Sequence, residues 1–309
     1  MCISIYIYYY PKKIRGRKLK TMKKRCVLTA VVMAGSMFLN GCDKKDVKPV
    51  ILAVSFGTSF DDNRELTIGA VEKAISSANS DFDTRRAFTS QIVIDVIKEN
   101  KGEEIDNVEE AFDKLVKDGV KELVVQPTHV ISGFEYDDLV TVVEKYEDKF
   151  DSISMGMPLL DTDEDYKKLA DALVADTESY SGDNTAIVFM GHGTHHEANE
   201  SYGKLQNVFF ENGNENYFVG TVEGTPALED VVKAVKDGGY KKVVLQPLMV
   251  VAGDHANNDM AGDEEDSWKT VFENEGFEVE CILRGLGEIK AVQDIYVSHT
   301  ANAVTALKK

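Results

Sequence analysis

The sequence predicts an α/β protein with two similar lobes, each a parallel β-sheet flanked by helices. Short apolar runs typical of buried strands alternate with amphipathic stretches from residue 50 onward, which favours parallel sheets. Two pairs of segments also repeat in the same order along the chain. A polar, turn-prone stretch at residues 180–184 separates the two copies.

The predicted elements follow one another in regular alternation. Strands are predicted at 50–55, 84–88, 122–126, 153–157, 186–190, 217–222, 242–246 and 279–283, most of which are short segments rich in apolar side chains. Helices are predicted where apolar residues recur at helical spacing, at 61–80, 91–99, 108–117, 135–149, 164–175, 197–210, 226–236, 263–273 and 288–307.

The internal repeat consists of two matched pairs of segments. Residues 51–60 (ILAVSFGTSF) align without gaps on residues 187–196 (IVFMGHGTHH). Residues 122–127 (ELVVQP) match residues 242–247 (KVVLQP). Two matched pairs in the same order predict that the two halves fold alike.

The repeat and the composition together predict the domain boundaries. We expect a leader and lipoprotein signal at residues 1–42 and a short tether at 43–48. An N-terminal α/β lobe follows at 49–183, and a C-terminal α/β lobe at 184–285. A C-terminal helix is expected over 286–309.

The segment from residue 22 resembles a bacterial lipoprotein signal. It begins with the basic run MKKR, continues with an apolar stretch at 26–39 that is too short for a comfortable membrane span, and ends in LNGC at Cys42. We therefore expect Cys42 to be the lipidated first residue of the mature protein, and a periplasmic or otherwise extracytoplasmic location on a lipid anchor. A plain signal peptide or an uncleaved anchor is the alternative interpretation.

The composition excludes one class of partner. The chain has 309 residues, of which 43% are hydrophobic and 28% charged, as in an ordinary globular enzyme. Its formal net charge is −18. Nucleic-acid binding needs a basic face, so we expect no nucleic-acid partner.

Three candidate metal ligands follow successive strands of the second lobe. His192 comes directly after a predicted strand, Glu223 after the next and His255 after the third. In open α/β sheets ligands bind at the carboxyl ends of strands. Two imidazoles and a carboxylate suit Co²⁺, Fe²⁺, Ni²⁺ or Zn²⁺, and three protein ligands leave open positions for a reaction at the metal.

Each candidate also has a purely structural interpretation. His192 and His255 could be satisfied polar residues near strand ends. Glu223 could begin the next helix, where a carboxylate favours the helix dipole. His195 and His196 are expected to open a helix and face solvent, rather than to bind metal.

Four motifs together resemble a known family. They are SFGTS at residues 55–59, GHGTHH at 191–196, VEG at 222–224 and GDHANNDM at 253–260. In order and spacing they are similar to the anaerobic sirohydrochlorin cobalt chelatases of the CbiK type, which belong to the class II chelatases related to ferrochelatase. The resemblance covers nearly the whole chain from residue 50.

The resemblance implies a chelatase-like fold with an active-site cleft between the lobes. It implies that His192, Glu223 and His255 hold the incoming metal, and that Glu135 faces this site from the first lobe. The implied activity is that of a lyase that inserts Co²⁺ into sirohydrochlorin during cobalamin-type biosynthesis. Co²⁺ would be the substrate metal, with Fe²⁺ as a further candidate, and no organic cofactor would be required.

Metal insertion must remove two pyrrole protons from the ring. A neutral imidazole both binds metal and accepts a proton near neutral pH, so His192 is expected to be the principal catalytic base. Glu135 is the candidate second catalytic base, although it could instead be an ordinary carboxylate in the first turn of a helix. The implied partners are sirohydrochlorin or a related tetrapyrrole, with haem as a further candidate, and a homo-oligomer is compatible with the sequence.

A second function class stays open. An exported protein could use the same cleft to bind and transport haem, another tetrapyrrole or metal without turnover, and the predicted lipid anchor favours this class. A metal-binding protein with no tetrapyrrole is a third interpretation. Because sirohydrochlorin carries many carboxylates, local positive charge is needed near the site. The basic candidates, each more often an ordinary solvated charge, are Arg64, Arg85, Arg86 and Lys204.

Overall fold

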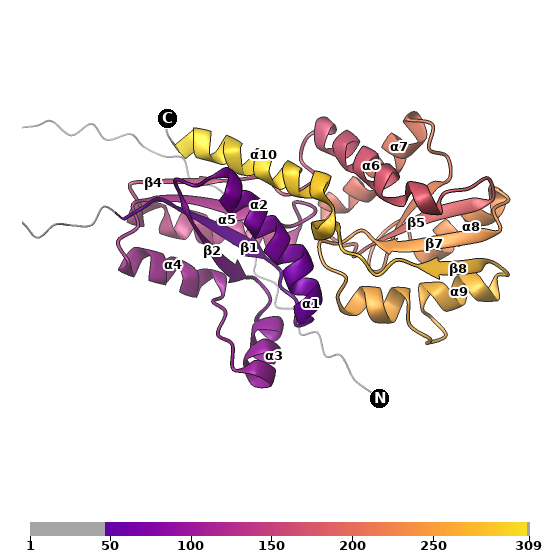
Figure 1. Ribbon diagram of the computed structural model, residues 1–309, viewed down its shortest axis with the longest axis horizontal. Coiled ribbons are helices and arrows are strands. Elements are labelled where there is room, and N and C mark those ends of the chain that lie inside the picture. Colours follow the sequence, from indigo (N-terminus) through magenta and orange to yellow (C-terminus); the bar gives the residue numbers. More distant parts are fainter. Residues whose placement is uncertain (1–46, 308–309) are drawn as a thin grey trace, which may run out of the picture. The chain divides into compact units, whose positions relative to one another are not determined.

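The structure is a computed structural model that describes residues 47–307. This part of the chain forms two four-stranded sheets in which all paired strands run parallel (Figure 1). The strands of the first sheet are β1 (Val50–Ser55), β2 (Asp83–Phe88), β3 (Glu122–Pro127) and β4 (Ser152–Met155). Those of the second are β5 (Thr185–Gly191), β6 (Tyr217–Thr221), β7 (Lys242–Pro247) and β8 (Glu278–Cys281). The predicted fold class, two similar lobes with parallel sheets, is confirmed.

The two sheets have the same topology. Their strand orders are β2-β1-β3-β4 and β6-β5-β7-β8. The registers also correspond, because Val54 pairs with Pro127 in the first sheet and Met190 with Pro247 in the second. In each sheet the chain changes direction between the two central strands, and loops that leave such neighbouring strands bound a crevice at their carboxyl ends.

The helices of the first half lie close to their predicted ranges. They are α1 (Asp61–Arg64), α2 (Ala70–Ala78), α3 (Gln91–Lys101), α4 (Val108–Lys117), α5 (Phe134–Tyr146) and α6 (Asp163–Thr177). The predicted single helix over 61–80 is interrupted by a π-helical turn at Glu65–Gly69. The Thr67 hydroxyl donates to the Asn63 carbonyl oxygen at 2.5 Å, four residues back, in the segment where this turn begins.

The helices of the second half are α7 (Glu200–Glu211), α8 (Leu228–Asp237), α9 (Trp268–Asn274) and α10 (Lys290–Leu307). The prediction of a helix from residue 263 was wrong at its start, because Ser267 caps the helix by accepting from the Thr270 N–H. A π-helical turn at Ala256–Met260, directly after His255, was not predicted.

Two helices pack on the sheet to which they do not belong in sequence. Helix α6 follows the last strand of the first sheet but packs against α7, and its buried Leu169 and Leu173 share a core with Phe189 of β5. Helix α10 follows the last strand of the second sheet but packs on α2, β3 and β4; Figure 1 shows it beside α2 and β4. One hydrophobic cluster therefore runs through both lobes, beside further clusters that belong mainly to a single lobe. The predicted boundary between residues 183 and 184 stays a prediction.

Two glutamines at equivalent positions contact α10 and α6, which are called the exchanged helices because each packs on the other lobe. Gln126 and Gln246 are fully buried at equivalent positions of β3 and β7. Gln126 lies 3.1 Å from the Thr300 hydroxyl of α10, whereas Gln246 donates to the Asp176 carboxylate of α6 at 3.2 Å. Helix α10 thus takes the place in the first lobe that α6 takes in the second.

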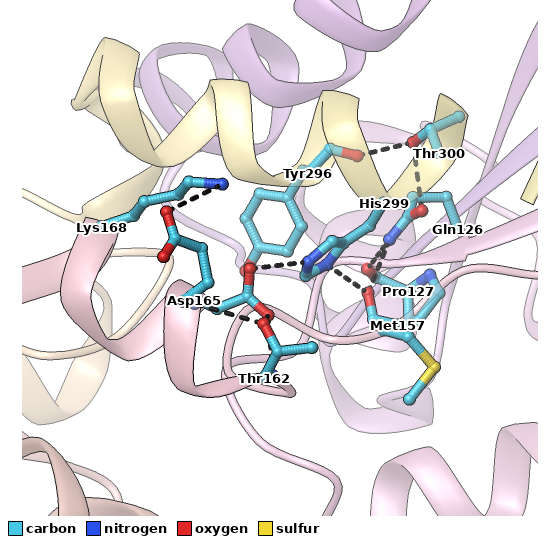
Figure 2. Close-up of polar contacts among 10 residues, drawn as sticks. Gln126, Pro127, Met157, Thr162, Asp165, Lys168, Tyr296, His299 and Thr300 are labelled. Carbon is cyan, nitrogen blue, oxygen red and sulfur yellow. Dashed lines mark hydrogen bonds and ion pairs between the residues drawn. The ribbon is translucent and has the colours of Figure 1, made fainter. Parts of the chain in front are cut away.

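A buried histidine joins the two exchanged helices where they meet. His299 of α10 faces the Asp165 carboxylate of α6 through Nε2 at 3.1 Å and the Met157 carbonyl oxygen through Nδ1 at 3.2 Å (Figure 2). Both side chains are 7% exposed. Asp165 also accepts from the N–H and the hydroxyl of Thr162, at 2.8 and 2.7 Å. The contact between α6 and α10 is therefore polar, and the His299 and Asp165 side chains have hydrogen-bond partners.

The predicted signal and Cys42 lie outside the described residues. Within residues 47–307, no helix is both long and apolar enough to cross a bilayer.

His129, just after β3, is half-buried, but both of its ring nitrogens are buried and have no hydrogen-bond partner among the described side chains and backbone. Burial lowers its pKa from 6.5 to about 4. The unfolded chain therefore takes up a proton near pH 6.5, whereas the folded chain resists it until about pH 4. Stability is expected to fall as the pH drops through this window.

The internal repeat suggests a test of what the unpaired His129 nitrogens cost in stability, because Met249 occupies the equivalent position in the second half. We expect His129→Met to raise the free energy of unfolding by about 1–3 kcal/mol, since it removes unpaired buried nitrogens. The variant should also lose stability less steeply than the parent between pH 6.5 and 4. Urea unfolding at several pH values measures both effects, and an unchanged pH slope would contradict the explanation.

Candidate metal centre

The predicted metal ligands lie in loops at the carboxyl end of the second sheet. His192 directly follows β5, Glu223 follows β6 and His255 lies in the loop after β7. Strands β5 and β7 are the central neighbours between which the chain changes direction. His192 and His255 therefore flank the position at which α/β sheets ordinarily bind ligands.

Close backbone packing fixes the loop that carries His192. Gly193 has a φ of +82°, and a Cβ on this residue would lie 2.5 Å from the Gly224 nitrogen. The Glu223 N–H donates to the His192 carbonyl oxygen at 2.7 Å. Glycine is required here because the loops after β5 and β6 touch through their backbones.

The His192 ring has one nitrogen engaged. Its Nδ1 lies 2.9 Å from the Gly193 carbonyl oxygen, which can only accept. The hydrogen-bond network therefore assigns the proton of the neutral ring to Nδ1. Nε2 keeps its lone pair, which is the arrangement of a metal-ligating imidazole.

His255 shows the same arrangement with a stronger partner. Its Nδ1 lies 2.5 Å from Oδ2 of Asp259, one helical turn further along the chain. Metal-ligating histidines commonly donate their second nitrogen to a carboxylate, which fixes the ring and makes it a better donor to the metal. The Nε2 atom of His255 is again the one that keeps its lone pair.

The two imidazoles lie side by side. Their ring centroids are 4.7 Å apart and the rings are nearly perpendicular, at 88°. His192 is exposed and His255 is half-buried, so the pair is open to an incoming ion. Two neutral imidazoles with oriented lone pairs can hold a divalent transition metal.

The carboxylate of Glu223 completes no preformed cluster. Its backbone is bonded to His192, and its side chain is exposed. Within residues 47–307, no three His, Cys, Asp or Glu side chains gather closely enough to hold a metal ion. The structure thus brings together two of the three predicted ligands, and the assignment of Glu223 stays a prediction.

Glu135 lies in the first turn of α5 in the first lobe. Its side chain is exposed and lines a surface hollow of about 340 Å³ together with Thr89, Glu109 and Asp138. No hydrogen bond or ion pair among the described residues joins it to the imidazole pair. Its role as a base also stays a prediction.

The two further histidines of the motif behave differently. His195 is exposed, as expected. The expectation that His196 faces solvent was wrong, because its side chain is only 17% exposed. His196 does open a short 3₁₀ turn, Glu197–Asn199, by accepting from the Ala198 N–H, but its ring is covered by the first lobe.

The loop that leads into His255 is held by the first lobe. The Ala252 N–H donates to Oδ1 of Asn63 at 2.9 Å. Thr58 is buried, and its hydroxyl lies 3.6 Å from where a Cβ on Gly253 would be. The SFGTS loop of the first lobe therefore supports the neighbouring loop of the second.

The basic candidates are all paired with acidic side chains. Their nearest ion-pair contacts are Arg64 to Glu103 at 2.7 Å, Arg85 to Asp118 at 2.7 Å, Arg86 to Glu72 at 2.6 Å and Lys204 to Asp163 at 2.7 Å. The hydrogen bond with Glu72 raises the pKa of Arg86 further. None of the four is therefore a free cation for an anionic substrate.

The contact of Asp259 with His255 was not predicted from the sequence, although its spacing of four on a helical turn was a usable signal. We expect Asp259→Ala to weaken Co²⁺ binding by about 10–100-fold, because the His255 ring loses the partner that orients it. Asp259→Asn should cost less, since its amide oxygen still accepts from Nδ1. Titration of Co²⁺ followed by visible absorption or calorimetry measures the change.

The exposed Asp254 provides the control for this prediction, because it contacts Asn258 rather than either imidazole. Asp254→Ala should bind Co²⁺ like the parent protein. Equal affinity of Asp259→Ala and the parent would show that Asp259 does not orient the ligand.

Comparison with solved structures defines the class of fold. The chain is similar to SirB from Bacillus subtilis with Fe³⁺, at a TM-score of 0.57 and 14% identity, covering 85% of this chain and 98% of the other. It is also similar to the sirohydrochlorin chelatase SirB from Bacillus subtilis subspecies spizizenii in complex with cobalt, at a TM-score of 0.56 and 12% identity, covering 85% and 97%. The fold is that of a two-lobed chelatase.

Sequence comparison narrows the class. The chain is 37% identical over 258 residues to a sirohydrochlorin cobaltochelatase of Salmonella typhimurium, covering 84% of this chain and 97% of the relative. It is 34% identical over 264 residues to the sirohydrochlorin cobaltochelatase CbiKC of Nitratidesulfovibrio vulgaris, covering 84% and 92%. The cobalt chelatase (CbiK) family model matches residues 49–305. The chain belongs to the cobalt chelatase (CbiK) family.

Proposed function

We propose that this protein is a sirohydrochlorin cobaltochelatase that inserts Co²⁺, its substrate metal, into the tetrapyrrole. The proposal draws on membership of the family and on the names of two relatives that align over most of the chain. The observation that carries it is the imidazole pair of His192 and His255, with both Nδ1 atoms engaged and both Nε2 atoms open.

The metal enters the site through the two Nε2 atoms, and Glu223 supplies a third, anionic ligand from the adjoining loop. Insertion exchanges two pyrrole protons for one divalent ion, so the protein must accept two protons as the metal moves to the ring nitrogens. His192 takes one proton at Nε2 when it releases the metal. Glu135 takes the other from the first lobe, which requires the lobes to approach each other around the macrocycle.

The proposal extends to the cellular location. Cys42 carries the lipid anchor, and the enzyme acts outside the cytoplasm with no organic cofactor. Replacing Cys42 with Ser should abolish incorporation of labelled fatty acid and release the protein from the membrane fraction. Membrane association that is unchanged in this variant would contradict the anchor.

The decisive experiment is anaerobic metal insertion by the purified full-length protein. Sirohydrochlorin absorbance is followed after addition of Co²⁺, beside a variant carrying His192→Ala and His255→Ala. We expect turnover above the spontaneous rate, lost in the variant, and slower turnover with Fe²⁺. If metal insertion is not accelerated but haem or sirohydrochlorin still binds tightly, the protein is an exported tetrapyrrole-binding protein and not a chelatase. Tight Co²⁺ binding without any macrocycle affinity would replace it with a metal-binding protein.

A further inference from the structure

The motif that carries His192 also makes a direct contact with the first lobe. His196, at the far end of this motif, lies 3.3 Å through Nε2 from Oδ2 of Asp137 on α5. The edge of one ring meets the face of the other between His196 and Phe134, with centroids 4.9 Å apart and planes at 78°. Phe134 is otherwise 55% exposed, so this contact covers part of an unusually open aromatic side chain.

Hydrogen bonds determine which nitrogen of His196 carries the proton. Nδ1 accepts from the Ala198 N–H at 3.0 Å, so it is unprotonated. The proton of the neutral ring therefore lies on Nε2, the nitrogen nearest to the Asp137 carboxylate. Because Nδ1 accepts a hydrogen bond and Nε2 carries the proton, His196 has no free lone pair for a metal, unlike His192 and His255.

The segment around His196 is rigidly connected to the metal centre. The Thr194 hydroxyl accepts from the His196 N–H at 3.1 Å, and Oδ1 of Asn199 accepts from the Thr194 N–H at 3.1 Å. Asn199 in turn donates to the Thr225 carbonyl oxygen at 2.8 Å, in the loop after β6. These bonds hold His196 in a fixed position relative to the loops that carry His192 and Glu223.

On the first-lobe side, the contact surrounds the predicted base. Phe134 and Asp137 lie in the first turn of α5, and Glu135 lies between them in sequence. The same helical turn thus presents one face to His196 and carries Glu135. The position of Glu135 relative to the imidazole pair depends on how this turn meets the second lobe.

We propose that Phe134, Asp137 and His196 form an interlobe clasp, and that His196 is a positioning residue for metal insertion. The inference rests on the proposed function for its catalytic consequence. The clasp holds the first turn of α5 against the loop of the metal ligands, so that the two proton acceptors act on one macrocycle. Asp137 is 60% exposed, and a partly solvated contact adds little to stability, so the clasp can open to admit the substrate and must close again before insertion.

Three variants isolate the clasp without removing the cap. His196→Asn keeps an oxygen for the Ala198 N–H but is too short to reach Asp137. Asp137→Ala removes the acceptor, whereas Asp137→Asn keeps an oxygen that accepts from Nε2. We expect kcat to fall about tenfold in His196→Asn and in Asp137→Ala, because a small misplacement of catalytic groups slows the reaction. KM and Co²⁺ affinity should stay within about twofold, and Asp137→Asn should keep nearly the full kcat.

The double variant separates coupling from two independent losses. His196→Asn combined with Asp137→Ala should be about as slow as either single variant, because both remove the same contact. His195→Asn, which removes the exposed neighbouring imidazole, is the matched control and should turn over like the parent. A hundredfold loss in the double variant, or single losses below twofold, would overturn the inference, and weakened Co²⁺ binding in His196→Asn would make His196 a ligand instead.

A second measurement tests the contact even if the proposed function fails. In protein labelled with ¹⁵N-histidine, the His196 signals should report a proton on Nε2 and should shift in Asp137→Ala but little in Asp137→Asn. A parent protein without turnover that shows this response would refute the chelatase while the clasp stands. A His196 signal indifferent to Asp137→Ala would refute the clasp whatever the activity.

Discussion

Asp165→Ala is expected to lower the free energy of unfolding by about 3–5 kcal/mol, because it leaves the buried His299 without its carboxylate. Both side chains are 7% exposed, and His299 faces oxygen acceptors with both ring nitrogens. The substitution also removes the acceptor for two donors of Thr162. Chemical denaturation at neutral pH, with Glu164→Ala as an exposed neighbouring control expected within about 0.5 kcal/mol, measures the loss.

The same pair has a defined pH dependence. Burial raises the pKa of Asp165, but the hydrogen bonds from Thr162 and the contact with His299 outweigh it and hold the pKa below the ordinary value of 3.8. A carboxyl group whose pKa is lower in the folded than in the unfolded chain stabilises the fold at any pH above the unfolded-state pKa. This stabilisation is lost as the pH falls through the folded-state pKa. The penalty of Asp165→Ala should therefore be complete at pH 6 and shrink only below about pH 4. A loss under 1 kcal/mol at neutral pH would mean that the pair does not join α6 to α10.

Separate expression of residues 49–183 and 184–309 is expected to yield no folded lobe from either fragment. The first fragment lacks α10, whose Val292, Ile295, Tyr296 and Leu307 are buried against the first lobe and α6. Burial of each such side chain contributes about 1.5–3 kcal/mol, and together these losses rival the whole stability of a domain. The second fragment lacks α6 and exposes the face of β5 and α7 that α6 covers.

Circular dichroism and solubility of each fragment alone, compared with the co-expressed pair, measure this dependence. The co-expressed fragments should associate and recover a cooperative unfolding transition, because all elements of the shared core are then present. Cooperative unfolding of either fragment by itself would show that the lobes are independent despite the exchanged helices.

Much of the fold was predictable, because the internal repeat can be recognised from short sequence segments. Apolar runs marked most strands of both sheets, although β2 carries two arginines, and the matched segments predicted that the two halves fold alike. The partner of each helix was not predictable, since the amphipathic pattern of α6 or α10 shows only that one face is buried. Which sheet covers that face depends on contacts such as Thr300 with Gln126, which are 174 residues apart in the chain.

The meeting of the two candidate histidine ligands was predictable to the extent that it depends on strand ends. His192 and His255 meet because parallel strands deliver their loops to one edge. The His196 contact was not predictable, because Asp137 belongs to the other lobe and nothing in the local pattern joins them. Sequence spacing likewise could not show that the Glu223 carboxylate is exposed while its backbone is bonded to His192.

The exchange of α6 and α10 also bears on how such a chain could arise. A single repeat with its last helix would leave one face of its sheet uncovered and one helix without a sheet. In two linked copies, the last helix of each copy covers the open face of the other copy's sheet. The peptide connection keeps the two copies together in this arrangement. Each half then needs the helix of the other half to complete its core. A substitution in an exchanged helix of one repeat therefore affects the packing of the other repeat. Such mutual dependence would preserve the common topology long after the sequences of the two halves had diverged, with one half keeping the imidazoles and the other the supporting loop.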